Sequence, residues 1–258
     1  MRDGATNMAL DDALLAGVGD GSSAPTVRVF GWSPPTVSLG HSQRAAEELD
    51  LDACRRAGVG VVNRPTGGRA VLHAGELTYS VAAPVGAEPL GRTILETYCA
   101  IGRALVAGLS RLGVPATLDE TGTDAGVKRG AASPPCFASS GRFEVVVGGR
   151  KLVGSAQRRA GRGVLQHGSL LIDSRHADIA GLVAGLSGGE RDELRRSLEA
   201  QTATLEGVLG RVVSFGETAR AIRAGFEEAW GADMVKGALG ASELEAAETR
   251  ARDYAVRR

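Results

Sequence analysis

Three consecutive strand-like segments between residues 142 and 172 constrain the fold more than any other feature of the chain. Their sequences are RFEVVV, RKLVGSAQRR and VLQHGSLLI. Gly148 and Gly149 separate the first two segments, and a glycine pair at this spacing favours the tight turn of a β-hairpin. The chain is therefore expected to contain a β-sheet that includes this hairpin.

Segments with a helical spacing of apolar residues lie on both sides of these strands. The clearest extends from about Thr93 to Leu112, and a shorter one extends from Asn7 to Val18. Residues 44–57 and a segment near 217–230 are also expected to be helical. Strands that alternate with helices predict an α/β (α+β) fold, in which a mixed β-sheet packs with helices.

Further strands are predicted in the first third of the chain. They occupy residues 26–32, 36–40, 58–62, 69–73 and 76–83. The last two are expected to pair as a hairpin, with His73 at the end of the first one. Residues 118–135 are rich in threonine, glycine, serine, alanine and proline, which predicts a loop.

The sequence changes to helical patterns with short connections after Asp173. A chain of 258 residues can form one large domain or one domain with a small appendage. We expect a main domain over residues 1–175, which carries the candidate catalytic residues. The helical C-terminal part, residues 176–258, is expected to pack on the same domain.

The composition argues against several classes of function. The 30 basic and 30 acidic residues cancel, so the overall charge gives no reason to expect binding to nucleic acid. No apolar run approaches the roughly 18 residues that span a bilayer, and the N-terminus lacks the apolar core of a secretion signal. A cytoplasmic protein without a membrane partner is expected.

The cysteines and histidines give no sign of a disulfide framework or a metal site. The three cysteines have no paired spacing, which favours a reducing compartment. Cys54 and Cys99 fall in helical patterns and are expected to be structural. The four histidines lack ligand spacing, so no metal site is expected.

Basic residues are concentrated between positions 128 and 162. This stretch contains eight basic residues and one acidic residue, Glu144, which gives a local formal charge of +7. The basic residues are Lys128, Arg129, Arg142, Arg150, Lys151, Arg158, Arg159 and Arg162. The stretch is either a solvated strand face or a surface that favours an acidic macromolecule or an anionic group.

Cys136 differs from the other cysteines because it lies in a predicted loop, directly after Pro134 and Pro135. A free thiol has a pKa of about 8.5, and a nearby ammonium group can lower that pKa by roughly 1–3 units. Lys151 follows across one strand and one turn, so it is a candidate for that ammonium. On spacing alone, Cys136 is either packing material or a nucleophile that Lys151 activates.

The segment RPTGGRAVLH contains a second candidate site. Arg64 and Arg69 flank Thr66, Gly67 and Gly68. Paired glycines allow backbone amides to approach an anion or a developing oxyanion closely. The alternative is an ordinary tight turn. Neither the phosphate-binding loop nor the dinucleotide-binding fingerprint is present.

Four motifs in one order resemble the biotin/lipoate A/B protein ligase family. They are NMALDDALL, RPTGGRAVLHAGELTYS, CFASSGRFEVVVGGRKLVGSAQRR and LQHGSLLID. Within the family, the chain is most similar to the cysteine-dependent octanoyltransferases of the branch that is like lipoate-protein ligase A. The similarity extends from about Asn7 to Asp173 and is weaker over residues 204–230. It implies the catalytic-domain fold of that family.

The resemblance also implies roles for individual residues. Cys136 would accept the acyl group and Lys151 would activate it. The substrate would be bound by Arg64, Thr66, Gly67, Gly68, Arg69, His73, Gly154, Ser155, Gln157 and His167. Asn63 stands where the family usually has the first arginine of an Arg-Arg pair, which leaves one anion contact open. The chain begins almost at NMALDDALL, so the family's short leading strand either lies upstream or is missing from the sheet.

The reaction that the resemblance implies moves an octanoyl group from octanoyl-acyl carrier protein, through a Cys136 thioester, to a lysine of a lipoyl domain. The acceptors would be lipoyl domains of 2-oxoacid dehydrogenases or the glycine cleavage H protein. The donor is an activated thioester, so no cofactor is implied. The alternatives are a lipoate-protein ligase that uses ATP and Mg through a lipoyl-adenylate, an octanoyl amidotransferase between lipoyl-type domains, and a non-catalytic module that binds lipoyl domains or carrier proteins.

Overall fold

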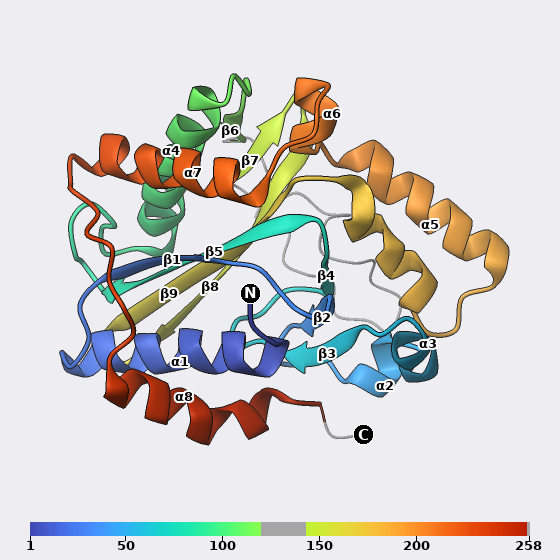
Figure 1. Cartoon of the computed structure of the whole chain (residues 1–258), viewed down its shortest axis with the longest axis horizontal. Coiled ribbons are helices and arrows are strands. Elements are labelled where there is room, and N and C mark those ends of the chain that lie inside the picture. The colour runs from blue at the N-terminus through green and yellow to red at the C-terminus, as the bar shows by residue number, and fades with distance from the viewer. Residues whose placement is uncertain (120–142, 257–258) are drawn as a thin grey trace.

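The computed structural model describes residues 1–119 and 143–256, and its largest element is a six-stranded antiparallel sheet (Figure 1). The strand order is β1-β5-β9-β8-β7-β6. The strands are β1 (Thr26–Phe30), β5 (Glu76–Pro84), β9 (Gly163–Leu171), β8 (Arg150–Ala160), β7 (Glu144–Val147) and β6 (Thr117–Asp119). β5 and β9 pair along their whole length and form the centre of the sheet.

A smaller sheet has the order β3-β2-β4 and lies beside the large one. It consists of β3 (Gly60–Asn63), β2 (Thr36–Leu39) and β4 (Val71–His73), where β2 pairs in parallel with β3 and antiparallel with β4. The hairpin expected between residues 69–73 and 76–83 is therefore wrong, because β4 and β5 belong to different sheets. β5 already has β1 on one edge and β9 on the other, so it has no free edge for β4.

Helices cover both faces of the large sheet (Figure 1). α4 (Ile94–Arg111) and α7 (Phe215–Trp230) lie on one face, while α1 (Gly4–Asp20) lies on the other with α8 (Ala241–Tyr254) packed outside it. The remaining helices are α2 (Ala45–Glu48), α3 (Leu51–Arg56), the 3-10 helix η2 (Ser174–Leu182), α5 (Gly188–Gln201) and α6 (Leu205–Leu209). This arrangement of a mixed set of strands with helices confirms the predicted fold class.

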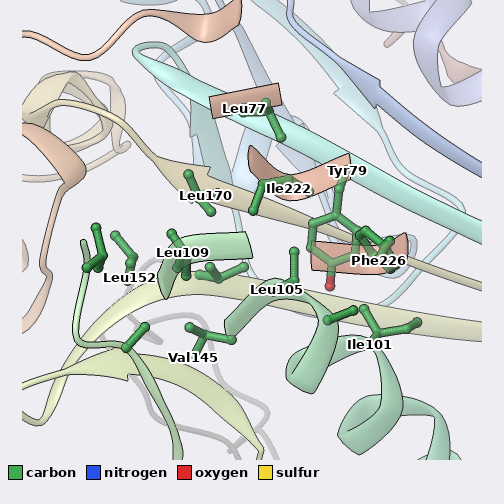
Figure 2. Close-up of a cluster of buried hydrophobic side chains, with 14 of the residues drawn as sticks. Leu77, Tyr79, Ile101, Leu105, Leu109, Val145, Leu152, Leu170, Ile222 and Phe226 are labelled. Atoms are coloured by element: carbon green, nitrogen blue, oxygen red, sulfur yellow. The ribbon is translucent and has the colours of Figure 1, made fainter. Parts of the chain in front are cut away.

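The main hydrophobic core lies between the large sheet and the helices α4 and α7 (Figure 2). Leu77 and Tyr79 enter it from β5, because residues two apart on a strand point to the same face. Ile101 and Leu105 enter it from α4 with the four-residue spacing of one helical face, and Phe226 enters from α7. All five side chains are almost fully buried. The core therefore fixes one face of the sheet and leaves the other face for α1 and the smaller sheet.

α4 and α7 cross at a pair of glycines. A Cβ added to Gly225 would lie 2.2 Å from the backbone nitrogen of Gly108, and a Cβ added to Gly108 would lie 2.7 Å from the carbonyl oxygen of Ala221. Both contacts are with backbone, which cannot rotate away as a side chain can. The two helix backbones therefore approach each other as closely as they do only because both positions lack a side chain.

We expect Gly225→Ala to destabilise the protein, because the added methyl group has no space at this crossing. Overpacking typically costs about 1–3 kcal/mol, which predicts a Tm lower by about 3–10 °C for a chain of this size. Gly189→Ala in α5 is the matched control, because nothing lies within 4 Å of a Cβ added there. Alanine also favours a helix more than glycine does. Thermal unfolding followed by circular dichroism compares the two variants, and equal Tm values would contradict the tight crossing.

Several predicted elements are confirmed. The helices expected near residues 7–18, 93–112 and 217–230 correspond to α1, α4 and α7, and the Gly148-Gly149 turn joins β7 to β8. Both turn glycines have a positive φ, which glycine adopts without strain. Residues 44–57 contain two short helices, α2 and α3. Cys54 is buried in the second core cluster, as expected of a structural cysteine.

Two further expectations concern segment boundaries. The loop expected from residue 118 is wrong at its start, because Thr117–Asp119 pairs with β7 as strand β6. The rest of that expected loop lies outside the described residues. The division at residues 175 and 176 stays a prediction, although α7 packs against α4 and α8 against α1 across that boundary. Among the helices of residues 1–119 and 143–256, none is long and apolar enough to cross a membrane.

Candidate active site

A pocket lies where the smaller sheet and α1 meet the large sheet. Its cavity volume is about 30 Å³, at the base of a concavity of about 390 Å³ that includes space open to solvent. It is lined by Met8, Trp32, Ser38, Arg64, Val71, His73, Thr78, Gly154, Ser155, Ala156, His167, Gly168 and Ser169. A concave site with apolar walls and a few polar groups is typical of small-ligand binding. The pocket brings together five of the predicted substrate residues: Arg64, His73, Gly154, Ser155 and His167.

The buried side chain of Arg64 holds the shape of the glycine turn beside the pocket. Its Nη2 donates to the carbonyl oxygens of Gly67 and Arg69 at 2.7 and 2.8 Å. Gly68 has a φ of +95°, and a Cβ added to the facing Gly40 would lie 2.1 Å from the carbonyl oxygen of Gly68. The turn is therefore packed tightly against the segment after β2 and is not an ordinary exposed turn.

Two residues next to the turn point away from the pocket. The side-chain amide of Asn63 donates to the carbonyl oxygens of Gly40 and Gln43 at 3.1 and 3.0 Å. Arg69 forms an ion pair with Glu48 at 3.0 Å. Neither Asn63 nor Arg69 lines the pocket. At the position where the family usually has an arginine, this chain therefore has an asparagine whose side chain binds backbone carbonyl groups.

His73 and Trp32 form one wall of the pocket. Their rings are stacked with centroids 4.0 Å apart, and His73 Nε2 lies 2.8 Å from Ser38 Oγ. Burial lowers the pKa of His73, although the hydrogen bond and charge of Glu76 act in the opposite direction. Trp32 Nε1 donates to Thr78 Oγ1 at 2.7 Å. This wall therefore consists of two stacked rings whose Trp32 Nε1 and His73 Nε2 atoms already form hydrogen bonds within the protein.

A chain of hydrogen bonds runs from α1 through His167 to the glycine turn. His167 Nδ1 lies 3.0 Å from Asp11 Oδ2, and His167 Nε2 lies 2.6 Å from Thr66 Oγ1. Asp11 is fully buried, and Arg28 donates to its Oδ1 at 2.6 Å. Burial alone would raise the pKa of Asp11, but Arg28, His167 and Ser80 outweigh it and lower the pKa. We call the connected residues Asp11, His167 and Thr66 the relay.

The direction of the hydrogen bonds in the relay follows from the charge of Asp11. An ionised carboxylate can only accept hydrogen bonds, so His167 Nδ1 must carry the ring proton. In the neutral ring, Nε2 is then an acceptor, and Thr66 Oγ1 donates to it. Within the described part of the chain, no further hydrogen bond is found at Thr66 Oγ1, which leaves its lone pairs able to accept.

Ser155 and Gly168 border the pocket next to Tyr79. Tyr79 Oη lies 2.7 Å from Ser155 Oγ and accepts from Gln166 Nε2 at 3.1 Å. Burial raises the pKa of Tyr79 to about 12, so its hydroxyl is neutral at pH 7. A Cβ added to Gly168 would lie 2.6 Å from the Tyr79 ring. Gln157 donates to Gln166 Oε1 at 3.1 Å and does not line the pocket.

Lys151 lies near the pocket on β8 but does not line it. Its Nζ lies 2.5 Å from Glu144 Oε1, and the two side chains are only 4% and 10% exposed. Glu144 is also the only acidic residue in the basic stretch. Because Lys151 is buried and paired with Glu144, it does not contribute to the positive charge that this stretch exposes to solvent.

A β-bulge sets the direction of Lys151. Val145 pairs with Val153, whereas Val146 pairs with Lys151, so Leu152 is an extra residue in β8. Leu152 and Val153 both enter the core between the sheet and α4. The extra residue interrupts the alternation of side chains and turns Lys151 to the opposite face, which is the face that lines the pocket.

Cys136 lies outside the described residues, as do the three basic residues Lys128, Arg129 and Arg142. The described residues that flank this segment are joined by a hydrogen bond from Phe143 N to the carbonyl oxygen of Asp119 at 2.7 Å. Phe143 directly precedes Glu144. The chain thus enters and leaves the segment of Cys136 next to the Lys151–Glu144 pair.

Several pocket residues could not be recognised from the sequence. Met8 falls within the helix expected from Asn7 to Val18, and Trp32 and Ser169 fall within predicted strands, so nothing in the sequence marks them as pocket residues. Asp11 did leave a signal, because it is an acidic residue inside an apolar helical pattern. In the structure, Ser169 Oγ is buried without a hydrogen bond to any described residue, so a ligand could provide its partner. Within the described residues, no three His, Cys, Asp or Glu side chains form a group that could hold a metal ion.

The fold and the pocket together define a class of protein. A pocket with apolar walls and a few buried polar groups, formed where two sheets meet, is typical of a protein that binds a small organic ligand. The chain is a member of the lipoyl protein ligase A/B catalytic domain family, whose pattern matches residues 3–227. The family and the fold predicted from the four sequence motifs are thereby confirmed.

Curated relatives are similar over almost the whole chain. The octanoyltransferase LipM of Kyrpidia tusciae is 42% identical over 246 residues, which cover 95% of this chain and 89% of the relative. The octanoyltransferase LipM of Symbiobacterium thermophilum is 42% identical over 253 residues, which cover 96% of this chain and 90% of the relative.

Two solved structures support the fold. A lipoate-protein ligase A bound with ATP matches with a TM-score of 0.76 at 21% identity and covers 98% of this chain and 92% of its own. The bi-partite lipoate protein ligase of Thermoplasma acidophilum, described with its E2 lipoyl domain, has a TM-score of 0.77 at 21% identity. This match covers 98% of the present chain and 90% of the ligase. At this identity the structures establish the fold alone.

Proposed function

We propose that this chain is an octanoyltransferase of protein lipoylation, which transfers an octanoyl group to a lysine of lipoyl domains. The observation that carries the proposal is the 42% identity, over almost the whole chain, to relatives named octanoyltransferase. In this proposal octanoyl-acyl carrier protein is the donor. The acyl group is held in transit as a thioester on Cys136.

The pocket suits the hydrocarbon part of such a substrate. Met8, Trp32 and Val71 contribute apolar surface to its walls. Each CH₂ group that leaves water for such surroundings contributes about 0.8 kcal/mol. Ser169 Oγ supplies a hydroxyl without a partner among the described residues, which suits the polar end of an acyl group.

The proposed reaction proceeds in two steps. The Cys136 thiolate attacks the donor thioester, a tetrahedral intermediate forms, and the carrier thiolate leaves. A neutral lysine amine of the lipoyl domain then attacks the enzyme thioester, loses a proton and releases the Cys136 thiolate as the amide forms. The first step exchanges one thioester for another, so it needs no ATP. The charge of Lys151 favours the thiolate over the thiol.

The basic stretch supports an acidic donor. Arg150, Arg158 and Arg162 are exposed, and they lie at the two ends of β8 and just before β9. Acyl carrier protein is expected to be strongly acidic, so it would be attracted to this surface. An attraction between exposed charges weakens as salt increases. The rate of acylation by the carrier should therefore fall with ionic strength more than the rate with a neutral octanoyl thioester does.

The test is acylation by octanoyl-acyl carrier protein without ATP. We expect a mass increase of one octanoyl group on the chain, its removal by hydroxylamine, and its transfer to a lipoyl domain. Pyrophosphate release that depends on ATP and free lipoate, without this adduct, would instead identify a ligase. An adduct formed only from an octanoylated lipoyl domain would identify an amidotransferase. Carrier binding without any adduct would identify a non-catalytic module.

A further inference from the structure

We propose that the relay of Asp11, His167 and Thr66 removes the proton from the acceptor amine in the second, amide-forming step. This inference rests on the proposed function. It assigns His167 as the final proton acceptor, Thr66 as the group that passes the proton on, and Asp11 as the positioning residue that acts through His167.

The geometry of the relay is that of a nucleophile, base and carboxylate arranged in a row. The two contacts of His167, 3.0 Å to Asp11 Oδ2 and 2.6 Å to Thr66 Oγ1, are both of hydrogen-bond length. The carboxylate fixes the ring with Nε2 directed at the hydroxyl, which is how a carboxylate orients a histidine base.

The relay borders the pocket at one of its members. His167 lines the pocket on β9, whereas Thr66 is 1% exposed, does not line the pocket and precedes Gly67 and Gly68 in the glycine turn. When the His167 ring is neutral, Thr66 Oγ1 donates its proton to Nε2, so its remaining capacity is to accept from an incoming N–H. The relay thus ends in a buried acceptor that lies one hydrogen bond away from the pocket-lining His167.

The chemistry of the second step requires such an acceptor. When the lysine amine attacks the thioester carbonyl, a C–N bond forms and the nitrogen becomes positively charged. The nitrogen then passes one proton to Thr66 Oγ1, while the Thr66 hydroxyl proton moves to His167 Nε2. The imidazolium is stabilised by Asp11, which remains a carboxylate. The C–S bond breaks, the electron pair leaves on the Cys136 sulfur, and the imidazolium returns its proton to solvent.

The first step does not need the relay, because the donor thioester is attacked by a thiolate and releases a thiolate. The relay therefore predicts an effect on one step only. Positioning that is purely structural would affect binding and both steps. The two steps can be measured separately in single-turnover experiments, with octanoyl carrier protein for acylation and a lipoyl domain for aminolysis of the isolated acyl-enzyme.

Thr66→Val is the main variant, because valine keeps the shape of threonine but lacks the hydroxyl. We expect acylation to stay within about threefold of wild type, whereas aminolysis by the lipoyl domain slows by about a hundredfold, as is typical of lost acid–base catalysis. Thr66→Ser should restore aminolysis because it restores the hydroxyl. Asp11→Asn, which leaves the ring without its fixed orientation, should show the same step-specific loss. Ser80→Ala is a graded variant, because Ser80 donates to the other oxygen of the Asp11 carboxylate and helps to keep it ionised, so its loss of aminolysis should be smaller than that of Asp11→Asn.

The pH dependence gives a readout that a structural role would not move. The charged and titratable groups around His167 are Asp11 from α1, with Arg28 from β1 behind it, and His73 and Arg64 across the pocket. These groups stay in place in Thr66→Val. The deficit in aminolysis should shrink at high pH, where hydroxide can take the proton from the attacking nitrogen in place of the relay. Hydroxylamine, a weakly basic nucleophile, should cleave wild-type and Thr66→Val acyl-enzymes at similar rates.

The outcomes separate this inference from the proposed function. If wild-type protein forms no acyl-enzyme, the proposed function fails and the relay with it. If the acyl-enzyme forms normally and Thr66→Val aminolyses it at the wild-type rate, the relay alone is overturned. Equal slowing of both steps that Thr66→Ser fails to rescue would likewise overturn the relay, since it would mean that Thr66 only supports the turn.

Discussion

Replacement of Cys136 by serine should abolish octanoyl transfer. A serine hydroxyl is not ionised near pH 7 and would form a less reactive ester, so both proposed steps lose their chemistry. We expect the rate of transfer to fall by about a thousandfold or more, as when a covalent nucleophile is removed. The measurement is the appearance of octanoylated lipoyl domain by mass spectrometry, together with the amount of octanoyl adduct on the chain.

The control for this experiment is Cys99→Ser. Cys99 lies on α4, is partly exposed and is unpaired, so it offers a second accessible thiol outside the pocket. This variant should keep the adduct and the transfer rate of wild type. Full transfer by Cys136→Ser would show that the acyl group does not travel on this sulfur. A loss of adduct and transfer in Cys99→Ser but not in Cys136→Ser would show that the thioester forms on Cys99 and not on Cys136.

Replacement of Lys151 by methionine should give the second largest effect, through the acylation step. A neighbouring cation lowers the pKa of a thiol, so its loss should raise the midpoint of the pH–acylation profile toward the ordinary thiol value of about 8.5. Acylation at pH 7 should then be about tenfold to a hundredfold slower. The deficit should disappear above pH 9, where the thiol ionises without help. A profile with an unchanged midpoint would remove Lys151 from the activation of Cys136.

The contact with Glu144 decides how this variant must be controlled. Lys151→Met removes one member of the buried pair with Glu144, and breaking a buried pair can cost about 3–5 kcal/mol of stability. The double variant Lys151→Met with Glu144→Gln removes both charges and should recover most of that stability. If the double variant regains the wild-type Tm but keeps the shifted pH profile, the slow acylation comes from the lost charge and not from a damaged fold.

Local sequence patterns predicted the elements whose cause is local. The helix α4 follows from the spacing of Ile101 and Leu105, and the β7–β8 hairpin follows from Gly148 and Gly149. The pairing of β4 with β5 was predicted wrongly from the same kind of evidence. Adjacent strands with a short connection usually pair, but here β5 fills both of its edges with strands from distant parts of the chain.

The candidate site was predictable in its motifs but not in its connections. The glycine turn, His73, His167 and Lys151 stood out as residues in motifs. The contacts that join them to their partners did not, because Asp11 and His167 are 156 positions apart in the sequence. The Lys151–Glu144 contact was also hidden, since strict alternation along β8 would have placed Lys151 on the same side as Val153. Contacts of this kind depend on the register of the sheet.

The bulge at Leu152 has a consequence for any attempt to exchange parts between family members. The β7–β8 hairpin can be grafted only if the number of residues between Glu144 and Gly154 is conserved, whatever their identity. A shortening by one would point the ammonium of Lys151 into hydrocarbon and strand its carboxylate partner. A sequence alignment that places a one-residue gap in this hairpin would therefore lead to a grafted protein in which Lys151 has the wrong direction and the enzyme is inactive.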